Sequence, residues 1–186
     1  MIEDILSDKI KSGSNSVRDN RFFIYLLDSN YNCSMTSFNY TNSLCNDYER
    51  VSSFMAFLIR KYGVNFYTSL RSNFSSTDSN VLFDNLIKQS GGIGFADELR
   101  KFSTTVSIFR PENNPPGFGF PFLSDQGFNL ASIFTPGYLG YRVPSVQPAV
   151  LNPFGGLHFY EINNTVGNFK KDIVVPPNTS VSIVIK

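Results

Sequence analysis

One stretch of this sequence, residues 47–63 (DYERVSSFMAFLIRKYG), constrains the fold more than any other. Its large apolar side chains recur at steps of three and four residues, which places them on one face of a helix. Charged and small polar residues take most of the other positions, and Gly63 stands where a helix commonly ends in a left-handed conformation. The pattern therefore predicts an amphipathic helix whose apolar face lies in a core. That face comprises Tyr48, Val51, Met55, Leu58, Ile59 and Tyr62.

Much of the remaining N-terminal sequence also has the spacing of helices. Serine and threonine precede the segment at 78–90 and a pair of glycines follows it, which is the capping chemistry of a helix. Residues 29–46 are polar and without a sustained period, so we expect a loop there. The sequence thus predicts a helical subdomain of about five helices over residues 1–110. The segments with helical spacing are 2–10, 18–28, 47–63, 64–72, 78–90 and 95–110.

The composition changes after Pro111, because residues 111–156 are dense in proline, glycine and phenylalanine. Proline prevents a helix from running through this region. Three β-like runs follow, at 156–162, 169–175 and 180–186, separated by turn-forming residues. We therefore expect an α+β chain: a helical subdomain at 1–110, then a Pro/Gly-rich segment and a small antiparallel β-module at 111–186.

Charge and hydropathy exclude several classes of partner. Only 17% of the 186 residues are charged and the formal net charge is +1, which gives no electrostatic reason to expect nucleic acid as a partner. No apolar run approaches the roughly 20 residues of a membrane-spanning helix. The first ten residues, MIEDILSDKI, have acidic residues among the apolar ones and no basic n-region, so we do not expect a signal peptide in them.

Cysteine and histidine are too few for a familiar metal site. Cys33 and Cys45 are the two cysteines and His158 is the single histidine. The cysteines form a disulfide if the protein works outside the reducing cytosol, and are otherwise two small unpaired hydrophobic residues; the sequence leaves both open. His158 falls in a predicted strand without a catalytic partner, so we interpret it as a structural histidine.

Acidic pairs and glycine-rich pieces also have structural interpretations. Glu3-Asp4 and Asp97-Glu98 each fall in the first turn of a predicted helix, where the helix dipole favours negative charge. The pieces GGIGF and GFGF lack the lysine and hydroxyl residue of a phosphate-binding loop, so we interpret them as turn and helix-start glycines. Aromatic residues of the Pro/Gly-rich region could line a groove, but filling the core is the better explanation. They are Phe118, Phe120, Phe122, Tyr138 and Tyr141.

The order of these parts is similar to a known arrangement. The acidic amphipathic start MIEDILSDKI precedes a helix of the form Y-x-x-x-x-x-F-x-x-x-L-x-x-x-Y-G, a glycine pair and a short F-x-x-x-L-x-x-F helix; the tail VVPPNTSVSIVIK suits terminal strands. This order resembles the region just downstream of the zinc site in secreted bacterial metallopeptidases of the hyicolysin and immune-inhibitor type. The matching residues are Tyr48, Phe54, Leu58, Tyr62, Gly63, Phe95, Leu99 and Phe102.

The resemblance implies a post-catalytic region. In that family a HEXXH helix and a later glutamate in a NEGL-type segment bind zinc, and neither motif occurs in this sequence. Zinc would therefore belong to an absent upstream segment. We expect no catalytic, cofactor-binding or metal-ligating residue in this chain and no catalytic activity from it alone, although the parent family consists of hydrolases.

Two functions remain as expectations. In the first, the chain is the non-catalytic C-terminal fragment of a secreted metallopeptidase-like protein, which supports the active-site half or binds a protein or peptide substrate. The resemblance then implies an extracellular or cell-surface location. In the alternative, the chain is a binding or structural module, such as a surface or virion component, and its aromatic Pro/Gly-rich region is the interface.

Overall fold

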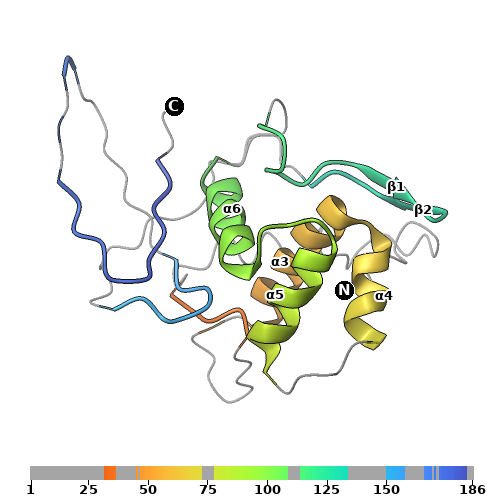
Figure 1. Cartoon of the computed structure of the whole chain (residues 1–186). Helices are drawn as coiled ribbons and strands as arrows, with labels where there is room; N and C mark the ends of the chain where they lie inside the picture. Colours follow the sequence, from red (N-terminus) through yellow and green to blue (C-terminus); the bar gives the residue numbers. More distant parts are fainter. Residues whose placement is uncertain are drawn as a thin grey trace.

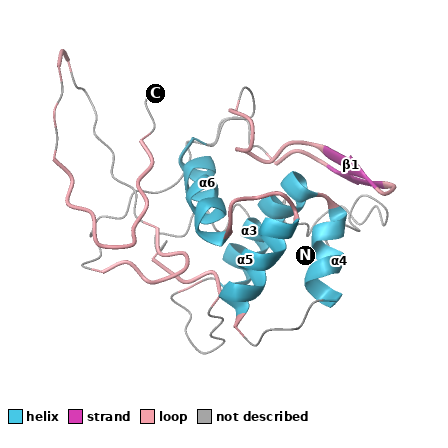
Figure 2. Ribbon diagram, in the orientation of Figure 1, coloured by secondary structure: helices cyan, strands magenta, loops and turns pink. Residues whose placement is uncertain are grey.

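The computed structural model describes residues 32–36, 45, 47–72, 78–108, 114–133, 150–157, 166–168, 170 and 172–183. Within them the chain forms four helices and one two-stranded antiparallel sheet (Figures 1 and 2). None of these helices is long and apolar enough to cross a bilayer. The elements are α3 (Asp47–Tyr62), α4 (Val64–Ser72), α5 (Ser79–Gln89), α6 (Phe95–Ile108), β1 (Leu123–Asp125) and β2 (Phe128–Leu130).

The α+β class is confirmed, and the expected number of helices is not matched. The four helices coincide, to within about two residues at each end, with the segments predicted at 47–63, 64–72, 78–90 and 95–110. The described part of the chain holds these four and not about five. The two other segments with helical spacing, 2–10 and 18–28, lie outside the described residues.

Local chemistry explains where the helices begin and end. Gly63 has a φ of 86° and its N–H donates to the Ile59 carbonyl at 2.8 Å, so the predicted left-handed stop of α3 is confirmed. Asp78 caps α5, because its Oδ1 accepts from the Asn80 N–H at 2.8 Å. The cap is thus the first residue of the predicted segment, and residues 73–77 before it lie outside the described residues.

The core lies where α3, α5 and α6 meet, and α3 is central to it. Residues 52–60 of α3 are all buried, including polar ones from the side expected to face water. Phenylalanine rings from α3 and α6 and from the segment after α6 contact one another edge to face or stacked. The largest residues of this core are Phe54, Phe57, Phe66, Phe95, Phe102 and Phe120, with Met55, Leu58, Leu86, Ile87 and Val106.

The antiparallel sheet lies earlier in the chain than predicted. Leu123 pairs with Leu130 and Asp125 with Phe128, which leaves a two-residue turn. Both turn residues have positive φ, 51° at Gln126 and 74° at Gly127, as a type I′ hairpin turn requires. The hairpin therefore forms inside the Pro/Gly-rich segment, for which no strand was predicted.

The expected β-module at the C-terminus is wrong for the parts that are described. Residues 172–183 contain no strand, and the strands predicted at 169–175 and 180–186 are absent from their described portions. Pro176 and Pro177 between them have no N–H to donate to a ladder. Of the run at 156–162, only Gly156 and Leu157 are described, and Gly156 forms an isolated antiparallel bridge with Asn32.

The hairpin packs on the end of α3 and the start of α4 (Figure 1). Arg60 is buried there, and its Nη2 donates to the Ala131 carbonyl at 2.9 Å. The Asp125 carboxylate accepts from the Val64 N–H at 2.7 Å and so satisfies a free donor in the first turn of α4. Arg60, a polar residue of α3 that was expected in water, is therefore covered by the segment that follows α6.

Candidate functional site

Of the acidic pairs singled out in the sequence, the described residues include only Asp97-Glu98. It lies in the first turn of α6, as predicted. Glu3-Asp4 and His158 lie outside the described residues. Among the aromatic residues, Phe120 is buried against Phe57 and Phe102, which confirms a core-filling role for it. Phe122 is 60% exposed, and Tyr138 and Tyr141 lie outside the described residues.

Glu98 is the centre of an ion cluster between α3 and α6. Its side chain is 0% exposed, and Lys61 of α3 donates to both carboxylate oxygens, at 2.8 Å to Oε1 and 2.7 Å to Oε2. Lys101, one turn further along α6, donates to Oε1 at 3.2 Å. Lys101 also lies 2.6 Å from Oδ2 of Asp97, whose Oδ1 accepts from Arg100 at 2.8 Å. Two carboxylates and three cations thus form one connected network.

The two lysines of the cluster differ in their titration. Burial lowers the pKa of Lys61, and the hydrogen bond to Glu98 opposes this only in part. Burial also acts to lower the pKa of Lys101, but its bonds to Asp97 and Glu98 outweigh burial and the pKa is raised. Burial alone would raise the pKa of Asp97, but Lys101 and Arg100 lower it. The Lys101–Asp97 pair therefore favours the charged form of both partners, whereas burial disfavours the charged form of Lys61.

Tyr62 borders the same cluster. Its hydroxyl is buried and has no well-formed hydrogen bond within the described part of the chain, yet it lies near Glu98. Burial first, the close approach of its hydroxyl to the Glu98 carboxylate second, and the charges of Glu98 and Asp97 last raise the pKa of this phenol. The Nζ of Lys61 lies 5.4 Å from the centroid of the Tyr62 ring, a distance at which a cation and a ring attract.

Gly92 has no side chain, and this lets the Tyr62 hydroxyl and the Ile87 side chain lie close to its Cα atom. A Cβ built at Gly92 would lie 2.3 Å from the Tyr62 hydroxyl and 2.5 Å from Cγ2 of Ile87. Both neighbours are held by the core, so neither has room to move. The glycines of GGIGF thus serve as turn glycines before α6, as predicted, and one of them also permits close packing.

We expect Gly92→Ala to lower the free energy of unfolding by about 2 kcal/mol, because overpacking a well-filled region strains its neighbours. Urea denaturation followed by circular dichroism measures this. In a Tyr62→Phe background the same substitution should cost less, since the hydroxyl is gone and only Ile87 remains in the way. An equal cost in both backgrounds would contradict the predicted clash with Tyr62.

The cluster is built for stability. A general base or a metal ligand needs an oxygen that a substrate or cation can reach, and Glu98 is fully buried and bonded to two ammonium groups. Within the described ranges, no three residues among His, Cys, Asp and Glu gather as a metal-binding group. Sequence reasoning identified Asp97-Glu98 but missed Lys61, which is 37 residues away in the chain and carries no local signal.

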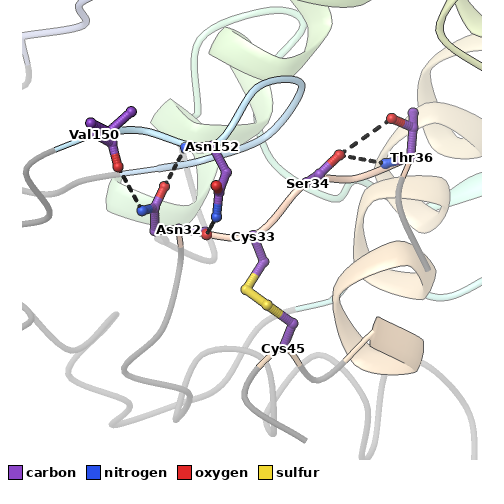
Figure 3. Close-up of a disulfide and its surroundings, with 7 residues drawn as sticks. All are labelled: Asn32, Cys33, Ser34, Thr36, Cys45, Val150 and Asn152. Carbon is purple, nitrogen blue, oxygen red and sulfur yellow. Dashed lines mark hydrogen bonds between the residues drawn. A yellow bond between two sulfur atoms is a disulfide. The ribbon is translucent and has the colours of Figure 1, made fainter. Parts of the chain in front are cut away.

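Cys33 and Cys45 form a disulfide, with their Cα atoms 5.9 Å apart (Figure 3). This decides between the two alternatives that the sequence left open. Cys33 is buried, and Met35, two residues later, belongs to the core. The disulfide therefore attaches the segment at 32–36 to the chain just before α3.

Comparison with known proteins gives one family. The family model described as Peptidase M30 matches residues 1–186, the whole of this sequence. A search of the curated proteins and a search of the solved structures give no match. The match agrees with the resemblance found from the order of motifs, and the chain belongs to the peptidase M30 family.

Proposed function

We propose that this chain is a non-catalytic region of a secreted, metallopeptidase-like protein and that it supports the half that carries the zinc site. The observation that carries the proposal is the state of Glu98. The one carboxylate that α6 buries completely is held by two lysines between α3 and α6, so it joins two helices and is not free for chemistry.

Zinc does not fit the residues of this chain. A site of the HEXXH type needs two histidines one helical turn apart, and this sequence has a single histidine. The ammonium groups of Lys61 and Lys101 beside Glu98 would also repel a cation at that carboxylate. We therefore assign no step of a hydrolytic reaction to this chain.

The disulfide supports an extracellular or cell-surface location. Disulfides form and persist in oxidising compartments and are rare where thiols are kept reduced. The Cys33–Cys45 bond joins cysteines 12 residues apart in sequence and leaves no free cysteine within the described residues. A secreted protein is the simplest setting for such a bond.

The C-terminal part of the chain offers the surface for a partner. Residues 172–183 expose several branched apolar side chains, and Val174 is 96% exposed. Contiguous exposed apolar residues usually mark an interaction site. The zinc-bearing half of the same protein, or a protein or peptide substrate, is the partner that membership of a peptidase family suggests. The exposed residues are Ile173, Val174, Val175, Val181 and Ile183.

The alternative, a binding module that uses the aromatic Pro/Gly-rich region, has less support. Phe120 is buried against α3 and α6 and is unavailable to a partner. Of the aromatic residues proposed for that interface and described, Phe122 alone is largely exposed. A single exposed ring does not make an interface of standard size.

An activity assay tests the proposal directly. We expect the purified, disulfide-bonded chain to leave fluorescently labelled casein intact at every added zinc concentration, with no more product than a protein-free blank. Hydrolysis that a chelator stops and that His158→Ala abolishes would overturn the proposal. The supporting role predicts in addition that a longer M30 protein containing HEXXH loses both activity and thermal stability when Glu98 is replaced by alanine in its corresponding region.

A further inference from the structure

The disulfide-bonded segment at 32–36 also contacts a distant part of the chain. We call residues 32–36 the docking segment and residues 150–157 the docked loop. In Figure 3 the docked loop lies beside the docking segment, near the Cys33–Cys45 bond, and dashed lines join Val150 and Asn152 to Asn32. More than a hundred residues separate the two segments in sequence.

Backbone and amide groups join the two segments. The Asn32 side chain donates to the Val150 carbonyl at 2.9 Å and accepts from the Asn152 N–H at 2.7 Å. The Asn152 side chain donates in turn to the Asn32 carbonyl. The Met35 N–H donates to the Phe154 carbonyl at 2.7 Å. Two of these four bonds use main-chain atoms of the docking segment and the other two use the Asn32 side chain, so all four need the docking segment in one conformation.

At two glycines of the docked loop, the two segments approach so closely that a side chain would not fit. A Cβ built at Gly155 would lie 2.7 Å from the Met35 nitrogen and 3.1 Å from the Cys33 carbonyl oxygen. A Cβ at Gly156 would lie 2.5 Å from Oδ1 of Asn32. The docked loop thus approaches the docking segment more closely than any residue with a side chain could.

The docking segment lies between the docked loop and the helices. Met35 packs in the core and the Thr36 hydroxyl donates to Oδ1 of Asn80 in α5 at 2.7 Å. The docked loop also contacts the helices and core directly, since Phe154 stacks on Phe95 at 6.4 Å and Leu157 packs against the core, but its described hydrogen bonds to another segment are with the docking segment. Because the docking segment has no helix or strand of its own, the disulfide at Cys33 is what fixes its backbone covalently.

We propose that docking of residues 150–157 depends on the redox state of Cys33 and Cys45. In the disulfide form the docking segment is held in place and the loop binds to it. Reduction by a dithiol breaks the S–S bond: the two sulfurs gain two electrons and two protons and become thiols, and the dithiol becomes a disulfide. The docking segment then loses its covalent tie and the loop leaves the helices. Oxidation by a disulfide such as oxidised glutathione reverses the reaction and restores docking.

This inference does not rest on the proposed function, since it concerns two segments of the chain and no substrate. In a reducing compartment residues 150–157 would be undocked, and in an oxidising one they would be docked. The C-terminal part would be joined to the helices only after oxidation. Exposed loops and undocked segments are also preferred sites of proteolysis, so oxidation would protect the chain.

Hydrogen–deuterium exchange of the full chain tests the proposal. The disulfide form and the form reduced with a phosphine are compared in peptides from residues 32–36, from 150–157 and from α3. We expect exchange in the docked loop to increase about ten-fold or more on reduction, while the α3 peptide stays protected, as local opening predicts. Equal exchange of the docked loop in both forms would overturn the proposal. Loss of protection in α3 as well would also overturn it, because the disulfide would then be needed for the whole fold.

Two further variants have both cysteines and an intact disulfide. They test the docking contact independently of the redox state. Asn152→Ala removes a side-chain bond to the docking segment, so its docked loop should exchange faster even when oxidised and respond less to reduction. Asn129→Ala removes a comparable amide contact, with Ser124 in the hairpin, and should leave the docked loop protected. A response of the Asn129 variant like that of the Asn152 variant would contradict the proposed contact.

Discussion

Replacing Glu98 with alanine is expected to lower the free energy of unfolding by about 3 kcal/mol, because two lysines then lose a buried carboxylate. The estimate lies at the lower end for buried pairs, since Lys61 and Lys101 each keep 20% of their side-chain exposure and can still be hydrated in part. Urea denaturation measures the change as a lower midpoint with an unchanged slope.

A matched set of variants separates charge from packing. Glu49→Gln changes a glutamate of α3 that is only partly buried, and we expect an effect within about 0.5 kcal/mol. The double variant Lys61→Met/Glu98→Leu should be more stable than Glu98→Ala, because it removes the pair together and leaves no unpaired ammonium group at residue 61. If the double variant were the less stable of the two, unpaired charge would not be the cause of the loss.

The helices could be predicted from the sequence because their signals are local. The apolar spacing of α3, the polar residues before α5 and the glycines after α3 and α5 lie within a few residues of the structure that they determine. The first-turn position of Asp97 and Glu98 was predicted in the same way. Local signals of this kind do not tell which distant segment packs against each face of a helix.

Arg60 shows how a packed neighbouring segment can bury a residue that the helical period assigns to the polar side. Its place in the helical period assigns it to the polar side of α3, yet it is buried because the Ala131 carbonyl after the hairpin accepts from its guanidinium group. Glu98 is similar, since its partner Lys61 comes from another helix. Tyr48 shows the reverse: it belongs to the apolar face by spacing, but it lies in the first turn of α3 and is exposed. Contacts between elements distant in sequence decide the burial of Arg60 and Glu98, and position at the end of the helix decides the exposure of Tyr48.

The strands could not be located because two signals conflicted. The β-branched residues near the C-terminus predict strands by propensity, but strands need partners, and residues 172–183 have no ladder among the described residues. The hairpin of β1 and β2 is short and lies among prolines and glycines, and its only local signal is the glycine of its Gln126-Gly127 turn. The position of the strands was therefore decided by which segments could pair and not by the β-propensity of their residues.

Replacing Phe102 with alanine is expected to lower the free energy of unfolding by about 4 kcal/mol, a large effect for a single substitution. Phe102 is 0% exposed and lies between three other rings, with centroids 5.3 Å from Phe54, 5.8 Å from Phe57 and 6.5 Å from Phe120. Alanine would leave a cavity bordered by α3 and by the segment after α6, and rigid rings collapse poorly into such a space.

The same site distinguishes lost volume from lost ring contacts. Phe102→Leu keeps much of the volume and should cost about 1.5 kcal/mol. Phe122→Ala removes an equally large ring that is 60% exposed, and we expect a change within about 0.5 kcal/mol. Because Phe102 and Phe120 contact each other, the double variant Phe102→Ala/Phe120→Ala should lose less than the sum of the single variants. Strict additivity would mean that the two rings stabilise the fold independently, and the contact between Phe102 of α6 and Phe120 of the following segment would then not couple them.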